Sequence, residues 1–271
     1  GDVVIDEIQT IIAKASNANE GRCLLREYLQ ARILETLQTQ GAFENWVFVG
    51  GTALRFLYDM PRFSEDLDFS LTHVKTDSRF LDHLKRVKTM LVSEGMDAEI
   101  KSRTSGAVQT AMVKFSGLLR EVGLSPLASE KISIKVEIDT NPPAGAKLET
   151  NIVRRHRLLH ILHYDKASLF AGKLHALLMR SYTKGRDVYD LLWYLSDRKW
   201  PEPNLIFLNN ALRQTHWDGE AIRKETWRQQ ILERVGSLDW PAVLADVRPF
   251  IERPNELAML NKESLLNLLQ A

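Results

Sequence analysis

The sequence contains no apolar run close to the roughly 20 residues that a membrane-spanning helix needs. Its first residues also lack the basic and then apolar pattern of a secretory signal. The single cysteine, Cys23, cannot form an internal disulfide, and the leucines around it favour a buried structural thiol. These absences predict a cytoplasmic protein.

Neither sign of charge is in excess, because 36 basic residues accompany 35 acidic residues and the net charge is +1. A dedicated nucleic-acid binder usually has a clear basic excess, so the overall charge does not indicate one. Two local clusters are positive, namely RRHR at 154–157 and the series Lys173, Arg180, Lys184 and Arg186. The composition, 44% hydrophobic and 26% charged, is that of a globular protein with a sizeable core.

A strand, a glycine turn and a helix are predicted around residue 50. The run WVFVGG (46–51) is rich in β-forming residues and ends in two glycines, whereas TALRFLYD (52–59) has helical spacing. Pro61 ends that helix, and EDLDFSL (65–71) then alternates acidic and apolar residues. We expect a strand there, with Asp66 and Asp68 on one face.

The rest of the chain divides into a sheet region and a helical region. Helical spacing is present over 5–37 and 78–93, while 97–103, 107–117 and KISIKVEID (131–139) have the pattern of strands. After Ala167 nearly everything is predicted as helix, with turns at Gly185, at 201–203 and at Pro254. The predicted domains are an N-terminal helical segment (1–41), a core of mixed sheet and helices (42–165) and a helical C-terminal domain (166–271).

The glycine turn and the two aspartates are the first candidates for chemistry. Gly50 and Gly51 allow the backbone to approach a phosphate closely, with the first N–H groups of the helix directed at its charge. A turn of this kind can also need glycine for steric reasons alone. Asp66 and Asp68 on one strand face would repel each other and favour a divalent cation, although an isolated pair of acids can also form a solvated edge. The combination is more specific than either part.

Nucleotidyl transfer often uses two metal ions held by three carboxylates. Glu137 and Asp139 share a face of the predicted strand 131–139, and either can supply the third carboxylate if that strand lies beside the one with Asp68. A polar face turned to water is the alternative for both residues.

The helix LFAGKLHALLMR (169–180) places Lys173 and Arg180 seven residues apart, on one face that can hold a triphosphate. A charged stripe on a solvated helix is the alternative. Asp187 and Asp190 follow near the start of the next helix, where Asp187 can be a structural first-turn acid. We expect the acids of two neighbouring strands and this cationic helix to face one hollow.

Histidines 156, 160 and 163 would share a face only if their segment were helical, which is the arrangement that a zinc site would need. The β-branched residues nearby are equally consistent with a strand, in which His163 would point away from the other two. Satisfied or solvated histidines are the favoured interpretation.

Three blocks in this order resemble a known family. FVGGTALRFLYDMPRFSEDLDFSL, KVEID and LFAGKLHALLMRSYTKGRDVYDLLWYL together are similar to the AbiEii/AbiGii nucleotidyltransferase toxins of bacterial abortive-infection and type IV toxin–antitoxin systems. The resemblance covers about residues 47–195, whereas the N-terminal helices and the region after 200 carry no matching motif. It implies an α+β fold, with a polymerase-β-like nucleotidyltransferase core followed by a helical C-terminal domain.

The resemblance also implies roles for individual residues. Phosphate would be held by the glycine turn, with Ser64 at the edge of the acidic strand, and metal by the acids of the two strands. The triphosphate would be bound by the cationic helix, and one further essential acid would have two supporting neighbours. The phosphate-binding residues would be Gly50, Gly51, Thr52 and Ser64, and the metal-binding residues would be Asp66, Asp68, Glu137 and, with a less certain place, Asp139. The triphosphate-binding residues would be Lys173 and Arg180. The further essential acid would be Asp187, supported by Arg186 and Asp190.

The function that these features predict is metal-dependent transfer of a nucleoside monophosphate from a nucleoside triphosphate (NTP), with Mg²⁺ or Mn²⁺ as cofactor. The resemblance implies an acceptor such as a transfer RNA end or a protein, and a cognate antitoxin as partner. Two alternatives stay open: a regulator that binds a nucleoside triphosphate without chemistry, and a transferase acting on small molecules of the aminoglycoside type.

Overall fold

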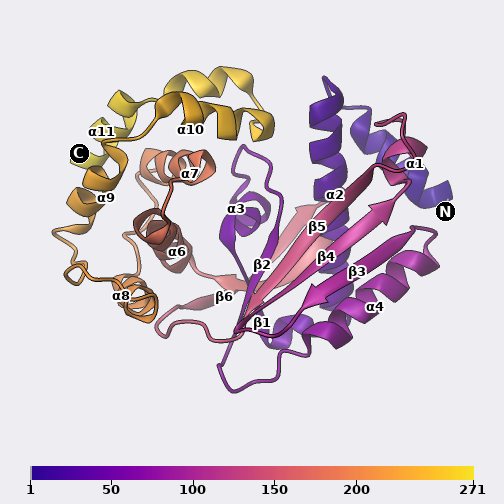
Figure 1. Cartoon of the computed structure of the whole chain (residues 1–271), viewed down its shortest axis with the longest axis horizontal. Coiled ribbons are helices and arrows are strands. Elements are labelled where there is room, and N and C mark those ends of the chain that lie inside the picture. Colours follow the sequence, from indigo (N-terminus) through magenta and orange to yellow (C-terminus); the bar gives the residue numbers. More distant parts are fainter. Residues whose placement is uncertain (1) are drawn as a thin grey trace. The chain divides into compact units, whose positions relative to one another are not determined.

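The computed structural model describes residues 2–271, and the chain divides into two compact units (Figure 1). The first unit contains the described residues up to Asp59, together with Phe63–Pro142 and Thr150–His163. The second contains Met60–Arg62, Pro143–Glu149 and Tyr164–Ala271. The short segment Met60–Arg62 therefore belongs to the helical unit, although it lies between two elements of the sheet unit.

A mixed seven-stranded sheet organises the first unit. Its strand order is β3-β4-β5-β2-β1-β7-β6. The strands are β1 (Trp46–Val49), β2 (Leu67–Leu71), β3 (Ala98–Arg103), β4 (Val108–Ser116), β5 (Lys131–Asp139), β6 (Leu148–Arg155) and β7 (Arg157–Tyr164). Strand β2 pairs antiparallel with β1 and parallel with β5. The acidic strand is thus interior to the sheet, and the predicted strand 131–139 lies beside it.

Five helices accompany the sheet in the described part of this unit: α1 (Asp2–Ile12), α2 (Ala18–Thr39), α3 (Gly50–Tyr58), α4 (Phe80–Ser93) and the short α5 (Leu118–Glu121). A 3-10 turn, η1 (Ala42–Glu44), precedes β1. Helix α2 begins where the Asn17 side chain accepts the Glu20 N–H, an N-cap that satisfies one of the free donors of the first turn. Helix α4 packs against β3 and β4, and α2 contacts α4 and β5 (Figure 1).

Alternation along β5 produces the core and leaves the polar face available. Ile132, Ile134, Val136 and Ile138 are buried, while the residues between them are at least partly exposed. Trp46, Phe48 and Phe69 are also buried on neighbouring strands β1 and β2. The predicted alternation of β5 is therefore confirmed, including the placement of Glu137 and Asp139 away from the core.

The second unit is helical. It contains α6 (Lys166–Met179), α7 (Gly185–Ser196), α8 (Leu205–Gln214), α9 (Trp227–Val235), α10 (Trp240–Val247), η2 (Arg248–Phe250), η3 (Pro254–Met259) and α11 (Lys262–Gln270). Helix α6 packs against α7, α8 and α9, and α10 packs against α7. Phe170 stacks on Tyr194 with ring centroids 4.5 Å apart, which joins α6 to α7. The expected turn at Gly185 lies slightly earlier, because Gly185 is the first residue of α7.

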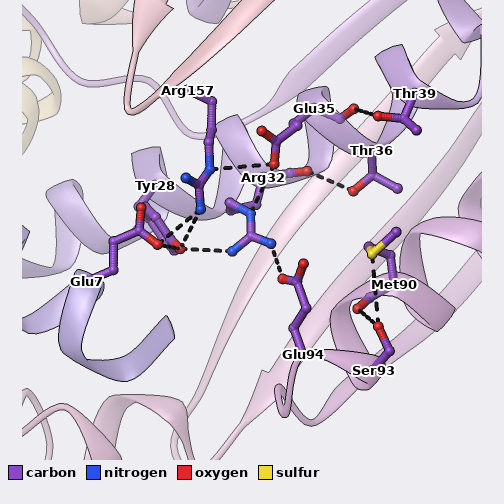
Figure 2. A network of polar contacts seen from close by, with 10 residues as sticks. All are labelled: Glu7, Tyr28, Arg32, Glu35, Thr36, Thr39, Met90, Ser93, Glu94 and Arg157. Carbon is purple, nitrogen blue, oxygen red and sulfur yellow. Dashed lines mark hydrogen bonds and ion pairs between the residues drawn. The ribbon is translucent and has the colours of Figure 1, made fainter. Parts of the chain in front are cut away.

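A partly buried polar network ties α1, α2 and the end of α4 to the start of β7 (Figure 2). The Tyr28 hydroxyl donates to Glu7 at 2.8 Å and accepts from Arg32 at 2.9 Å. Arg32 also pairs with Glu94, just after α4, and Arg157 donates to Glu7 at 3.0 Å. Charges that are taken out of water are costly unless they are paired, and each of these has a partner.

Acidic side chains also pair with most of the basic cluster RRHR at 154–157. Arg155 pairs with Glu27 and Asp59, and His156 contacts Glu27 at 2.9 Å. Arg155 therefore has a structural role in holding the β6–β7 hairpin to α2, and the cluster is not an open cationic surface.

The histidine segment is a strand, as the favoured interpretation requires. His163 is fully buried on β7 and its Nε2 lies 2.7 Å from the Asn151 amide, whereas His160 is exposed. In the part of the chain that the structure describes, no helix combines the length and apolar character needed to cross a bilayer.

Candidate functional site

The glycine turn lies directly against an acid of the neighbouring strand. Strand β1 ends at Val49, Gly50 has φ +83°, and α3 begins at once. A Cβ atom at Gly50 would lie 2.8 Å from Asp68 Oδ2, closer than real side-chain carbons come. Val49 is also the Cα partner of Asp68 in the β1–β2 pair. Glycine is required here both for the left-handed backbone and because Asp68 occupies the adjacent space.

The loop before β2 is fixed by hydrogen bonds from α2 and α3. The Thr52 hydroxyl lies 2.8 Å from the Ser64 hydroxyl and also donates to the Asp66 carbonyl oxygen. The Gln30 amide donates to the carbonyl oxygens of Ser64 and Glu65, at 2.9 Å each. Thr52 is only 1% exposed, so in this conformation its hydroxyl holds the loop that carries Asp66.

Asp68 and Glu137 are neighbours across two strands. They are Cα partners in the parallel pair of β2 with β5, and residues paired in this way point to the same face of a sheet. Asp139 lies two residues further along β5, opposite Ser70, and burial raises the pKa of its carboxyl. We expected Asp66 to share the strand with Asp68. Strand β2 instead begins at Leu67, so Asp66 lies in the loop fixed by Thr52.

A cation that the sequence analysis did not single out stands among these acids. The Lys135 ammonium lies 2.7 Å from Glu137 Oε1. Its hydrogen bond to Glu137 and the charges of Glu137, Asp66 and Asp68 raise the pKa of Lys135. The period of two along β5 could have indicated it, because that period places Lys135 on the same face as Glu137.

The second unit contains a buried chain of alternating charges. Lys173 on α6 lies 2.7 Å from Asp187 and 2.8 Å from Asp190, both on α7. Asp190 accepts two hydrogen bonds from the Arg62 guanidinium, at 2.6 and 2.7 Å, and Asp187 pairs with Arg180. Three cations and two anions therefore alternate in this network.

Burial and charge act in opposite directions on this network. Burial alone would raise the pKa of the Asp190 carboxyl, but Arg62 and Lys173 lower it below its ordinary range. Burial alone would lower the pKa of the Lys173 ammonium, but Asp187 and Asp190 raise it. Both groups are therefore ionised at neutral pH. The Arg180 side chain, at the end of the chain of charges, is 39% exposed and is the member most open to a ligand.

Two further predicted residues have defined partners. Asp187 lies in the first turn of α7, whose N-cap is Lys184, as the structural alternative expected. Its carboxylate also pairs with Lys173 and Arg180. Arg186 is held by Asp246, which accepts from both its backbone N–H at 2.9 Å and its guanidinium at 3.3 Å. The Arg186 guanidinium also lies 4.4 Å from the centre of the Phe250 ring.

Residues 32–262 match the family described as nucleotidyl transferase AbiEii toxin, type IV TA (toxin–antitoxin) system. The chain belongs to the AbiEii family. The match extends well beyond the sequence blocks at 47–195 and includes most of the helical unit. No functionally curated protein matches the sequence.

Two solved structures are similar in fold to this AbiEii-family chain. One is a Helicobacter pylori protein described as a candidate nucleotidyltransferase, with a TM-score of 0.54 and 24% identity. That match covers 92% of this chain and 93% of the other. The second is JHP933 from Helicobacter pylori, with a TM-score of 0.54, 22% identity, and coverage of 92% and 90%. The predicted α+β fold, a mixed sheet with helices followed by a helical C-terminal region, is confirmed.

The acids of this AbiEii-family chain have the donor chemistry that Mg²⁺ and Mn²⁺ prefer, namely carboxylate oxygens on adjacent strands. Among the described residues, however, no three His, Cys, Asp or Glu side chains are arranged to hold a metal ion. The Lys135 ammonium instead provides the positive charge beside Glu137, and the charges of Asp66 and Asp68 also act on it. The carboxylates therefore have the ligand chemistry that a divalent ion needs, and in the structure the Lys135 ammonium is the cation beside them.

The sequence analysis missed Arg62 as well as Lys135. Arg62 is 3% exposed, and its partner Asp190 is 128 residues away in the chain. Spacing cannot reveal a pair that distant. The only local signal was its position four residues before Asp66, in the sequence RFSEDLD.

Proposed function

We propose that this chain transfers a nucleoside monophosphate from a nucleoside triphosphate to an acceptor hydroxyl and releases pyrophosphate. The observation that carries the proposal is that Asp68, paired with Glu137 across β2 and β5, adjoins the Gly50 turn at the start of α3. Carboxylates beside a glycine-initiated helix provide places for both a divalent ion and a phosphate. Membership of a nucleotidyltransferase family supports the same conclusion.

In the proposed reaction, the acceptor oxygen attacks the α-phosphorus and forms a new P–O bond. The bond between the α-phosphorus and the bridging oxygen of pyrophosphate breaks, and the hydroxyl proton passes to a carboxylate or to water. Mg²⁺ or Mn²⁺ bound to Asp66, Asp68 and Glu137 would make the attacking hydroxyl more acidic and offset the charge on pyrophosphate. The N–H groups of Gly51 and Thr52 at the start of α3 would bind phosphate oxygens.

We propose that Lys173 and Arg180 supply positive charge to the triphosphate. In the structure Asp187 and Asp190 hold these two cations. Arg180 would contact the phosphates directly, because it is partly exposed, with Lys173 held behind it by Asp187 and Asp190. In this proposal Asp187 orients the two cations, and Asp190 and Arg186 support the helix that carries them.

The acceptor that we propose is an RNA end, with transfer RNA and protein hydroxyls as the classes to compare. The family belongs to type IV toxin–antitoxin systems, which supports the role of a toxin with a cognate antitoxin. A toxin of this kind would act in the cytoplasm, where its acceptor is found.

Transfer can be tested by incubating the full chain with total RNA, Mg²⁺ and each of the four nucleoside triphosphates labelled at the α-phosphorus. We expect labelled RNA with the wild-type chain, and at least a hundredfold less with Asp68→Asn, because the metal loses a charged ligand. Asp82→Asn is the matched control, since Asp82 is an exposed acid that pairs only weakly with Arg79 on the surface of α4.

Two results would redirect the proposal. Binding of a triphosphate with no pyrophosphate released would identify a regulator. Label in an aminated sugar, with none in RNA or protein, would identify a small-molecule transferase. Equal labelling by the wild-type chain and by Asp68→Asn would contradict the proposed site itself.

A further inference from the structure

Lys135 differs from the other lysine of its strand in the charges around it. Both belong to β5, and their side chains are similarly exposed, 39% for Lys135 and 46% for Lys131. Lys131 is 3.9 Å from the single acid Glu99, whereas Lys135 is 2.7 Å from Glu137 and also within the field of Asp66 and Asp68. Lys131 therefore forms an ordinary surface pair, whereas Lys135 pairs with an acid that is itself the strand partner of Asp68.

The three acids need a counter-ion in the absence of metal. Carboxylates that share a site repel one another, and the repulsion favours protonation or separation unless a cation compensates it. The Lys135 ammonium lies 2.7 Å from Glu137, and Glu137 is the strand partner of Asp68.

The geometry assigns Lys135 the role of an internal counter-ion, which occupies the place of a divalent ion among Asp66, Asp68 and Glu137 and leaves when that ion binds. This role rests on the proposed function only in using the same acids. A lysine can do this because its four-carbon stem is flexible and its ammonium is strongly hydrated when released. The partial exposure of Lys135 gives it a path to solvent.

The consequence is an exchange of one cation for another at the site. Binding of the divalent ion must break the contact between Lys135 and Glu137, so the apparent affinity is lower than that of the three acids alone. The metal-free protein is at the same time protected from the repulsion between its acids. Because Lys135 competes with the divalent ion, a higher concentration of that ion is needed to fill the site.

The test is the dissociation constant of Mn²⁺, measured by calorimetry and by electron paramagnetic resonance on the full chain without nucleotide. We expect Lys135→Met to bind Mn²⁺ about tenfold or more tightly than wild type, since an opposing charge close to a carboxylate changes its affinity for a cation by that order. Lys131→Met, with the same change on the same strand, should bind like wild type. Lys135→Arg keeps the charge and should bind Mn²⁺ no more tightly than wild type.

A second measurement separates this role from a purely structural one. Without metal, Lys135→Met should melt at a lower temperature than wild type, and Mn²⁺ should raise its melting temperature by more. Asp68→Asn should bind Mn²⁺ weakly in either background, which identifies the ligands. If Lys135→Met melts too low to handle, Lys135→Gln supplies the same comparison with a polar side chain.

The outcomes distinguish the inference from the proposed function. A dissociation constant in Lys135→Met and Lys135→Gln equal to or weaker than that of wild type would overturn the counter-ion role, whatever the transfer activity. The chain can also bind Mn²⁺ through Asp68, bind it more tightly when Lys135 is replaced, and transfer no nucleotide. That result would sustain the inference and refute the proposed reaction.

Discussion

At the scale of the residue, Gly50 shows how a backbone requirement and a site requirement coincide. Its φ of +83° is strained for any other residue, and the space where a side chain would go is taken by Asp68. From sequence alone, Gly50 and Gly51 could be interpreted either as a phosphate-binding turn or as glycines required for steric reasons. The structure indicates that the steric reason at this position is an acid of the candidate site.

Gly50→Ala should therefore lower the free energy of unfolding by more than left-handed backbone strain alone would. We compare it with Gly117→Ala, since Gly117 has a similar φ of +73° but no atom within 4 Å of the place that an added Cβ would occupy. Gly117→Ala should lose about 1–2 kcal/mol of unfolding free energy from left-handed strain alone. Gly50→Ala should lose more in urea unfolding, and its transfer activity should fall. Equal losses in the two variants, with activity intact, would show that Asp68 does not depend on this space.

At the scale of the element, helix α2 holds the β6–β7 hairpin through one buried carboxylate. Glu27 is 3% exposed and contacts Arg55, Arg155 and His156. Burial by itself would raise the pKa of Glu27, but the hydrogen bond from His156 and the charge of Arg55 lower it from 4.5 to about 2. The ionised carboxylate is thus the form that the folded protein prefers.

The stability that Glu27 provides has a defined pH window. Because its pKa is depressed in the folded state, the stabilisation is complete above pH 4.5 and is lost as the pH falls from 4.5 towards about 2. Glu27→Gln should cost about 3–5 kcal/mol near neutral pH, because it breaks a buried charge network. The melting-temperature difference from wild type should shrink as the pH is lowered from about 7 to about 3. Glu121→Gln, at an exposed position on α5, should show no such trend; a constant difference for Glu27→Gln would contradict this account.

Elements with a strong periodic pattern could be predicted, and those set by distant contacts could not. The alternation of KISIKVEID fixed the two faces of β5, because burial of four apolar residues outweighs other local preferences. Strand β2 was predicted two residues too long at its start. The reason is that the Thr52 hydroxyl and the Gln30 amide, both remote in sequence, hold the preceding loop in another conformation.

At the scale of the whole molecule, sequence motifs located chemical groups but not the partners of those groups. Lys173 was predicted to bind phosphate, and the structure adds that two aspartates already hold its ammonium. The pairing of Arg62 with Asp190 joins a segment before the acidic strand to a helix far along the chain, and no periodicity encodes it. The sequence analysis left the pairing of β2 with β5 as a condition for a third carboxylate, and the structure shows that the two strands do pair.

The central proposal is that Asp68 and Lys173 both take part in the proposed transfer. The most direct test is pyrophosphate release from a triphosphate and an RNA acceptor by Asp68→Asn, Lys173→Met and the double variant. Lys173→Met should still fold, because Asp187 keeps Arg180 and Asp190 keeps Arg62 as partners. Circular dichroism and the melting temperature check this point.

Residues that act as a unit in catalysis give losses that do not add. We therefore predict that each single variant loses at least a hundredfold in the rate of pyrophosphate release, and that the double variant loses little more than either. A folded Lys173→Met variant that releases pyrophosphate at the wild-type rate would contradict the claim.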